Sequence, residues 1–561
     1  MRIMLRQILH IILNWWIPSL IQTLIRLIIQ VRITHIVHKI IRPIILASIR
    51  LIIRVLIIRI ALIRLITQVR TSLTNLILHT VLIILHANMV NYIILPFRFS
   101  RFNETEYLLT NDVGEYIFLD NEDFVKFINN ELDTKSTIFQ NIASKQIATT
   151  DNIEDVVNML ATKFRTKKSI LRDFTSLHMV VPTLRCNSSC IYCQVARKNV
   201  DDHEADMNRK TAKKVIKSIF QSPSPYIKIE FQGGDPSTYL DMVKYMIEEA
   251  EWQNLFKKKD LSFVICTNVT LLTPEDVKYL KKHKCYISTS LDGPKDLHNT
   301  NRPLQNTTHT HEKFEENVNM IREICGQHSV SALMTTSRHS LGRFKDIVDE
   351  YVRMGFNNIF FRALNPYGFA KQYKDKIAYP VEDFIDNFKE GLDYIIELNK
   401  KGLFFVEGYT ALLLKRILTP YATGFVDLQS PAGVGIAGVI YDWDGNVYVA
   451  DEGRMMARFK NYYFKLGNVN EDDYQSMFNG KKLHNIIENA CTECLPMCSE
   501  CVFQPYCGAD PVRNYSEQGD IVGHRPTSDM CKKNTAIMHY LFELLKKNDS
   551  EINRIFWSWL N

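Results

Sequence analysis

Short apolar runs alternate with amphipathic stretches through the middle of the chain. Six runs have the length and composition of strands, and they fall at residues 177–183, 226–231, 262–266, 285–290, 330–335 and 358–362. The intervening segments repeat apolar residues at helical spacing, as in residues 239–252 and 341–354. Strands that alternate with helices form parallel sheets with helices packed on them. The pattern therefore predicts an α/β fold over residues 173–400, either a doubly wound sheet or a partial barrel.

Different patterns flank this middle part. Residues 107–119 have the pattern of a β-hairpin, and helical stretches follow, so residues 89–172 are expected to form a small α+β domain. From about residue 425 to 535 the chain turns to Gly-rich loops, a hairpin signal at residues 442–446 and many cysteines. Residues 536–561 are expected to form a helical tail.

The first 88 residues differ from all the rest. They form a low-complexity run of Ile, Leu and Arg, and the first acidic residue of the chain is Glu104. Between residues 43 and 63, fourteen Ile, Leu or Val favour membrane insertion by about 0.4 kcal/mol each, and three Arg oppose it by up to about 3 kcal/mol each. The free energy of inserting this segment as a membrane span is therefore close to zero. The Arg residues also do not keep to one face of a helix that would lie on a membrane surface. We expect no membrane contact and translation from Met89, which mass spectrometry of the native N-terminus tests.

Charge and cysteine content limit the functional classes to which the residues after the first 88 can belong. Of 68 basic side chains, eleven lie in the first 88 residues, which leaves 57 against 61 acidic ones. This mild acidity gives no reason to expect nucleic-acid binding. Nine of the twelve cysteines lie in two clusters, a pattern that favours metal ligation in a reducing compartment, here the cytoplasm.

The first cysteine cluster follows the first predicted strand and consists of Cys186, Cys190 and Cys193. A 4Fe-4S cubane takes four thiolates, so three leave one iron open to another ligand. An open iron is what reductive cleavage of S-adenosylmethionine to a 5'-deoxyadenosyl radical requires. A zinc site is the alternative, but zinc usually takes two ligand pairs, and the sequence has no fourth ligand nearby. The spacing therefore favours a cluster that binds S-adenosylmethionine.

These residues resemble the radical S-adenosylmethionine (SAM) superfamily. Tyr192 matches the superfamily's aromatic residue before the last cysteine, and Gly-Gly-Asp-Pro at residues 233–236 resembles its Gly-Gly-Glu-Pro turn. The resemblance implies a partial (β/α)6 radical SAM barrel, whose active site lies at the carboxyl ends of the strands. It implies as cofactor-binding residues Tyr192, Gly233, Gly234, Asp235, Pro236, Asn268, Ser290, Asp292 and Arg362. Several of these are equally common as caps or turn residues.

The second cysteine cluster comprises five cysteines between residues 491 and 507, followed by Cys531. A zinc ribbon is one alternative. The segment resembles the iron-sulfur SPASM domain of radical maturases, in which seven cysteines hold two auxiliary 4Fe-4S clusters. The resemblance implies that one auxiliary cluster is bound by Cys498, Cys501, Cys507 and Cys531. Where the other cluster needs cysteines, this sequence has Ala432 or a neighbour, Ala450 and Pro511. We therefore expect two clusters in all.

The remaining chemistry-bearing residues are open to two interpretations. Cys491 and Cys494 are extra to the SPASM pattern and could be spare, structural or alternative ligands. The isolated Cys266, Cys285 and Cys325 are expected to be buried structural thiols. Relatives with a catalytic base carry an Asp where this chain has Asp451, which is either that base or part of a polar loop.

A further resemblance, over residues 89–545, is to the radical SAM maturases of the His-Xaa-Ser system, HxsB. It rests on the segments 95–99, 107–116, 193–195, 508–511 and 523–528. It implies an oxidoreductase that modifies a ribosomal precursor peptide rich in His-Xaa-Ser repeats, beside a second radical maturase, HxsC. It also implies an electron donor such as flavodoxin or ferredoxin. Residues 89–172 would dock the peptide, by strand addition to the hairpin, or form only a structural cap.

Two other functions are open at this point. One is a sulfatase-maturase-like oxidation of a Ser or Cys on a protein, against which the missing auxiliary cluster argues mildly. The other is a non-catalytic iron-sulfur or zinc scaffold. The sequence leaves the bond formed undecided among a crosslink, an epimerisation and a dehydrogenation.

Overall fold

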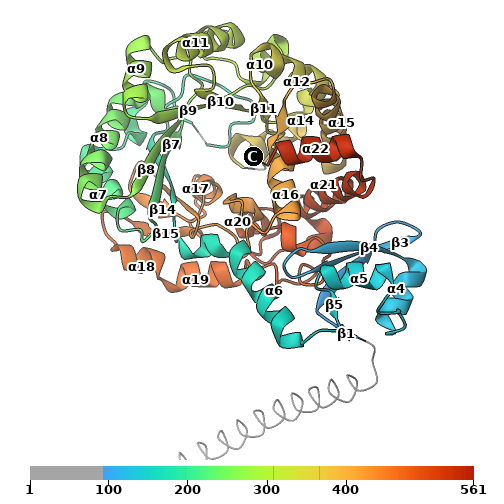
Figure 1. Cartoon of the computed structure of the whole chain (residues 1–561). Coiled ribbons are helices and arrows are strands. Elements are labelled where there is room, and N and C mark those ends of the chain that lie inside the picture. The colour runs from blue at the N-terminus through green and yellow to red at the C-terminus, as the bar shows by residue number, and fades with distance from the viewer. Residues whose placement is uncertain (1–91, 196, 308, 366, 561) are drawn as a thin grey trace, which may run out of the picture. The chain divides into compact units, whose positions relative to one another are not determined.

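The computed structural model describes residues 92–560, apart from residues 196, 308 and 366 (Figure 1). The predictions for residues 1–88 and for a start at Met89 lie outside the described residues. Within the described part, no helix combines the length and the apolar character needed to cross a membrane.

A three-stranded antiparallel sheet lies near the start of the described chain. Its strands are β2 (Phe97–Arg101), β3 (Glu106–Asn111) and β4 (Tyr116–Asp120), in that order, so the predicted hairpin is present. Helices α4 (Asn121–Ile128) and α5 (Thr137–Ser144) follow, and β1 (Ile93–Ile94) pairs with β5 (Ala148–Thr149). Tyr92, Phe127 and Phe139 are almost fully buried between these elements. Helix α6 (Ile153–Lys167) then leads to the central sheet.

Five neighbouring parallel strands form the larger part of the eight-stranded central sheet. They are β6 (Leu177–Thr183), β7 (Tyr226–Gly233), β8 (Asp260–Cys266), β9 (Cys285–Ser290) and β10 (Val330–Leu333), each beside the next. Figure 1 shows the outer helices around them, namely α7 (Arg209–Ile219), α8 (Leu240–Lys257), α9 (Pro274–Lys282), α10 (Lys295–Asn301), α11 (Thr310–Cys325) and α12 (Phe344–Arg353). Val180, Ile229 and Ile265 are fully buried, and burying each such side chain contributes about 1.5–3 kcal/mol. The α/β prediction is confirmed.

The sixth predicted strand leaves this sheet. Strand β11 (Asn358–Ile359) has only two residues and pairs in parallel with β12 (Val406–Glu407). The backbone amide of Thr336 still donates to the carbonyl of Arg362 at 2.9 Å. The chain after β11 therefore lies beside the chain after β10, and the rim of the barrel continues without a full strand.

The C-terminal region extends the sheet at its other edge. Strand β13 (Gly438–Tyr441) pairs in parallel with β6, and the predicted hairpin at residues 442–446 joins it to β14 (Asn446–Tyr448), followed by β15 (Lys465–Asn468). The other helices after α12 are α13 (Gly368–Gln372), α14 (Lys374–Ile377), α15 (Val381–Lys400), α16 (Gly408–Leu418), α17 (Asp451–Ala457), α18 (Tyr474–Phe478), α19 (Lys481–Glu488), α20 (Pro511–Gln518), α21 (Asp529–Lys546) and α22 (Ser550–Ser558).

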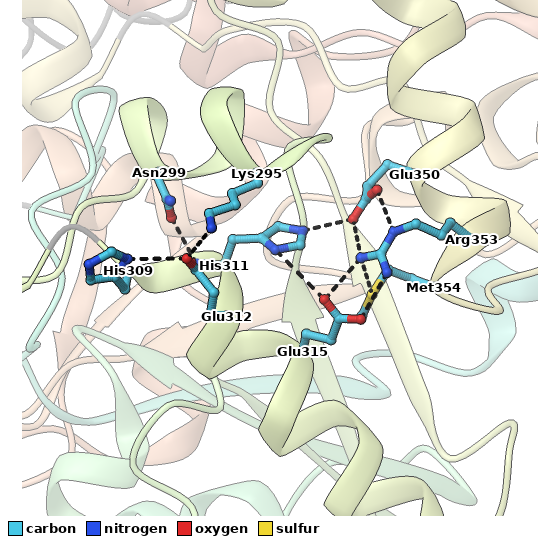
Figure 2. Close-up of polar contacts among 9 residues, drawn as sticks. All are labelled: Lys295, Asn299, His309, His311, Glu312, Glu315, Glu350, Arg353 and Met354. Carbon is cyan, nitrogen blue, oxygen red and sulfur yellow. Dashed lines mark hydrogen bonds and ion pairs between the residues drawn. The ribbon is translucent and has the colours of Figure 1, made fainter.

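An ionic network between α11 and α12 ties the outer helices together (Figure 2). His311 Nε2 lies 2.7 Å from Glu350 Oε1, and Arg353 Nη2 donates to the same oxygen at 2.7 Å. Arg353 Nη1 also donates to Glu315 at 2.8 Å. Burial alone would raise the pKa of Glu350, but the hydrogen bonds from Arg353 and His311 outweigh it and lower the pKa to about 2. The network therefore holds Glu350 ionised.

Candidate active site

The loop that carries Cys186, Cys190 and Cys193, which we call the cysteine loop, starts directly after β6. Cys186 is 8% exposed, and its pKa is raised by burial and by the charges of Asp235, Cys190 and Cys193. Burial raises the pKa of Cys190 to about 11, with Arg302 opposing the rise and Cys193 adding to it. Cys186 and Cys190 are therefore close enough to neighbouring cysteines for the charges of those cysteines to raise their pKa values. The structure brings the three predicted ligands together.

An ion pair buried behind this loop supports it. Asp292, at the carboxyl end of β9, has no exposed surface, and Arg302 Nε donates to its Oδ1 at 3.0 Å. The Tyr192 hydroxyl donates to the other carboxylate oxygen of Asp292. The Arg302 guanidinium lies over the Tyr192 ring, 5.2 Å from its centroid. Asp292, predicted to bind the cofactor, is thus engaged by Tyr192 and Arg302.

Asp235 joins the ends of β7 and β8. Its Oδ1 accepts from the Thr267 hydroxyl at 2.7 Å, and its Oδ2 accepts from the backbone amide of Asn268 at 2.8 Å. The Ser237 amide donates to Oδ1 as well, at 2.9 Å. Both carboxylate oxygens are therefore engaged, and Pro236 is buried at the start of the next turn. These two predicted residues fix the shape of the Gly-Gly turn.

Gly234 is required by the packing of β7 against the cysteine loop. A Cβ atom at this position would lie 2.2 Å from the carbonyl oxygen of Arg185 and 2.3 Å from that of Leu184. Only glycine permits so close a backbone approach. The turn therefore sits directly against the chain that leads into Cys186.

Asn268 holds the cysteine loop to the end of β8. Its Nδ2 donates to Asn187 Oδ1 at 2.7 Å and to Ser188 Oγ at 2.8 Å. Asn187 and Ser188 stand between the first two cysteines, so this contact orients the loop.

These residues surround a cavity of about 1210 Å³ that opens to solvent. The predicted residues on its wall are Cys186, Cys190, Tyr192, Cys193, Gly233, Gly234, Asp235, Asn268, Ser290, Arg362 and Asp451. Three clustered thiols and a glycine turn facing one cavity fit an iron-sulfur cluster with an exchangeable ligand. We call it the cofactor cavity.

A second cavity of about 1530 Å³ lies next to the first. The two share the wall residues Glu230, Gln232, Leu333, Arg362 and Asp451. A molecule bound in the second cavity would therefore adjoin the cofactor cavity. We call it the inner cavity.

Asp451 stands at the junction of the two cavities, on the first turn of α17. Its Oδ1 accepts from Arg454 Nε at 3.0 Å. Arg454 is fully buried, and its Nη1 and Nη2 have no hydrogen-bond partner among the described residues. This guanidinium therefore holds the Asp451 carboxylate in place beside both cavities.

The four cysteines of the predicted auxiliary cluster come together around the first turn of α21. Burial, with Cys507, Cys531 and Cys498, raises the pKa of Cys501 to about 12. The pKa of Cys531 is raised to about 11 by burial and by Cys507 and Cys498. In contrast, the pKa of Cys491 is raised by burial, Glu493 and Cys494, and by none of those four. The two extra cysteines form a separate group.

Apolar side chains occupy the place of the other auxiliary cluster. Ala432 is 0% and Ala450 7% exposed, and both lie in one apolar group with Val512, next to the buried Pro511. These positions pack as a hydrophobic core.

The isolated cysteines differ in setting. Cys285 is 6% exposed, as expected for a structural thiol, and Cys325 is partly buried. Cys266 lies on the wall of the cofactor cavity, and burial and Glu230 raise its pKa.

No three His, Cys, Asp or Glu side chains of the described residues are grouped as ligands of a single metal ion. A cubane distributes its thiolates over several irons, so its ligands need not meet at one point.

Sequence reasoning missed Arg302 and Asn187. Arg302 has no motif spacing that marks it, and only the fold brings it to the cofactor cavity. The position of Asn187 inside the cysteine loop was a usable signal, since loop residues beside ligands often orient them.

Comparison with known proteins agrees with this geometry. Residues 180–350 match the Radical SAM superfamily. The chain is 22% identical over 334 residues to the cysteine-type anaerobic sulfatase-maturating enzyme of Clostridium perfringens, covering 54% of this chain and 80% of that one. It is 26% identical over 306 residues to the radical SAM cyclopropyl synthase TigE of Paramaledivibacter caminithermalis, covering 51% and 59%. The solved structure of native anSMEcpe with bound AdoMet matches with a TM-score of 0.56 and 19% identity, over 68% of this chain and 99% of that one.

Residues 180–350 are therefore a Radical SAM domain, and the protein is an enzyme whose cofactors are a 4Fe-4S cluster and S-adenosylmethionine. It is related to cysteine-type anaerobic sulfatase-maturating enzymes and to a radical SAM cyclopropyl synthase. The alternative of a non-catalytic scaffold is set aside. When bound, the cofactors supply a carbon-centred radical that abstracts hydrogen. Cys186, Cys190 and Cys193 would hold the cluster, and Tyr192, Asp292 and Arg302 keep the loop rigid around it.

Proposed function

We propose that this enzyme modifies a ribosomally synthesised precursor peptide of the His-Xaa-Ser system. The observation that carries the proposal is the inner cavity, which shares five wall residues with the cofactor cavity and has room for a peptide side chain and its backbone. The His-Xaa-Ser assignment itself rests on the sequence resemblance over residues 89–545. The proposal includes HxsC and a flavodoxin or ferredoxin as partners, and a cytoplasmic location.

We propose further that, when the reaction is an oxidation, the substrate radical left by hydrogen abstraction would lose a proton to Asp451 and an electron to the auxiliary cluster. The place of Asp451 at the junction of the two cavities supports this role, because a base must reach the reacting carbon. Arg454 acts as a positioning residue that orients the carboxylate.

A single auxiliary cluster on Cys498, Cys501, Cys507 and Cys531 completes the proposal. The mutual charge effects among these thiols support it, as does the apolar packing of Ala432 and Ala450.

The sheet of β2, β3 and β4 is the proposed docking place for the peptide. Within the described residues, β2 and β4 each have a hydrogen-bonded neighbour on one side only, which leaves an edge for strand addition.

Oxidation of a Ser or Cys on a protein is a second candidate, and the relatedness to sulfatase-maturating enzymes favours it. The two candidates are separated by incubating the reconstituted enzyme with S-adenosylmethionine and dithionite, beside either a co-encoded peptide or a sulfatase peptide. Our proposal expects more than one equivalent of 5'-deoxyadenosine per enzyme and a change in the mass or in the residue chirality of the co-encoded peptide. A mass change in the sulfatase peptide alone would favour the second candidate.

A further inference from the structure

A third cavity, of about 500 Å³, shares no wall residue with the cofactor cavity or the inner cavity. Its wall includes Lys167 and Lys168 at the C-terminal end of α6, Arg416 in the last turn of α16, and the loop residues Gln429 and Ser430. Three basic side chains, carried by two helices far apart in sequence, thus border one space. We call it the basic cavity.

The acidic side chains on the wall of the basic cavity already have partners. Glu493 forms an ion pair with Lys168 and accepts from the Ser430 hydroxyl. Asp112 forms an ion pair with Arg98 at 2.6 Å. These pairs engage both carboxylates and one of the three basic side chains of the wall, so the other two have no carboxylate within ion-pair distance among the described residues.

Lys167 has unused hydrogen-bond donors. An ammonium group carries three N–H donors, and Lys167 Nζ donates one of them to the carbonyl of Arg416, at 2.9 Å. The Tyr506 ring lies on another side, with its centroid 5.6 Å from Nζ. Burial and then the charge of Arg416 lower the pKa of Lys167 to about 7, although Glu115 opposes them. An anion in the basic cavity would offset this unfavourable environment and accept from the unused donors.

Arg416 serves the neighbouring segment instead. Its Nε donates to the carbonyl of Tyr506 at 2.8 Å, and its Nη2 donates to the carbonyl of Pro505 at 3.1 Å. Cys507 and Glu493 add negative charge near this guanidinium, although neither forms an ion pair with it. Arg416 is therefore accounted for by the chain that leads into Cys507, and Lys167 is the cation of the wall that has no counter-charge in contact.

A buried amide on the same wall is an independent sign of a ligand. Gln429 is 4% exposed, and neither its Oε1 nor its Nε2 has a hydrogen-bond partner among the described residues. The large majority of buried side-chain polar atoms in native proteins are hydrogen-bonded, because an unpaired one is destabilising. Lys168 donates to the carbonyl of Ser430, which fixes the loop of Gln429 against the end of α6. A ligand in the basic cavity can therefore reach both Gln429 and Lys167.

We propose that the basic cavity binds a small oxyanion, namely a phosphate or a carboxylate group. The oxyanion would accept from Lys167 Nζ and Gln429 Nε2, and charge-assisted hydrogen bonds of this kind are the strong ones in proteins. The proton of a hydrogen phosphate, or the amide N–H beside the terminal carboxylate of a peptide, would donate to Gln429 Oε1. Because the basic cavity shares no wall residue with the inner cavity, the inference goes beyond the proposed function and does not depend on it.

Equilibrium dialysis against the full-length, cluster-loaded enzyme tests this inference, with S-adenosylmethionine present to fill the cofactor cavity and the ionic strength held constant. The probes are radiolabelled inorganic phosphate and N-acetylglycine, with N-acetylglycinamide as the uncharged match. At least one anion is expected to saturate a single site and to bind about tenfold or more tightly than the amide. Phosphate binding would identify a free oxyanion as the ligand, and binding of N-acetylglycine alone would identify a peptide terminus. No saturable binding of either anion would overturn the inference.

Variants then assign the binding to the basic cavity. Lys167→Met removes the cation, and Gln429→Glu places a carboxylate beside it in the position of the ligand, so each is expected to weaken binding about tenfold or more. Lys213→Met, which removes an exposed lysine on α7, is the matched control and should bind as the wild type does. Binding that survives both wall substitutions would contradict the assignment, and so would binding that Lys213→Met removes.

Thermal unfolding of Gln429→Met gives a readout that a merely structural glutamine would not produce. Without the anion, this variant is expected to melt at a higher temperature than the wild type, because it removes two unpaired buried polar atoms. Adding the anion should raise the melting temperature of the wild type and leave that of the variant unchanged. A lower melting temperature of the variant in anion-free buffer would show that Gln429 is satisfied within the protein, and would contradict the proposal.

Discussion

Arg302 and Asp292 form an ion pair behind the cysteine loop, with Arg302 Nε 3.0 Å from an aspartate that has no solvent exposure. Because the same aspartate accepts from the Tyr192 hydroxyl, the pair connects the end of β9 to the residue before the third cysteine. Removing one member of a buried pair leaves an uncompensated charge. The rigidity of the cysteine loop therefore depends on a residue that no cofactor motif contains.

Arg302→Leu is expected to lower the free energy of unfolding by about 3–5 kcal/mol, the usual cost of breaking a buried pair. Urea denaturation followed by circular dichroism measures it. Arg343→Leu is the matched control, since the Arg343–Asp296 pair is largely exposed and its loss costs about 1 kcal/mol or less. Equal losses in the two variants would show that Arg302 has no special structural role.

Iron content tests the number of clusters. With two 4Fe-4S clusters, the anaerobically reconstituted chain binds about eight irons. Replacing Cys186, Cys190 and Cys193 together by Ala should leave about four, and so should replacing Cys498, Cys501 and Cys507. Cys491→Ala is the control and should retain all the iron, because this thiol lies apart from the four. About twelve irons in the wild type, by chemical assay and Mössbauer spectra, would refute the two-cluster count.

Asp451→Asn separates radical formation from product formation. An amide accepts no proton at neutral pH, so modified peptide should fall about 10²-fold or more, the usual contribution of a general base. Release of 5'-deoxyadenosine should persist, since Asp451 is not among the cluster's thiol ligands. Liquid chromatography of both products from one reaction measures the ratio. If Asp451→Asn forms product at the wild-type rate, the carboxylate is a polar loop group and not the base.

The Glu350 network gives the fold a pH dependence (Figure 2). The pKa of Glu350 is lowered to about 2 in the folded protein, from an ordinary value of 4.5 for a glutamate side chain. A lowered carboxylate pKa stabilises the fold fully above about pH 4.5, and this stability is lost as the pH falls toward 2. Glu350→Gln should therefore destabilise the protein at pH 7, and the difference from wild type should shrink between about pH 4.5 and 2.5. Melting curves at several pH values check this, with Glu275→Gln, which removes an exposed carboxylate on α9, as control. A difference that stays constant over that range would contradict the assignment.

Local pattern predicted much of this molecule. The strand runs β6 to β9 and both hairpins lie close to where composition placed them, because β-branched side chains and turn glycines act over a few residues. The Cys186, Cys190 and Cys193 spacing predicted a cluster site because three thiols so near in sequence are near in space.

Such local patterns could not predict which distant segments pair with one another. β13 joins β6 although about 260 residues separate them, and β11 leaves the sheet to pair with β12. The same holds for the site, since Arg302 reaches the cofactor cavity only through the fold. Sequence spacing carries no information on such contacts.

The central claim is that radical chemistry at the Cys186 loop modifies a peptide. The most direct measurement is the intact mass of a co-encoded precursor peptide, together with the chirality of its residues after hydrolysis, when the peptide is co-expressed anaerobically with the wild-type chain and separately with Cys186→Ala. The account predicts a changed mass or a D-residue in the peptide with the wild type and neither with the variant, at equal amounts of folded enzyme. A peptide unchanged in both respects with the wild type, or the same change with both chains, would contradict it.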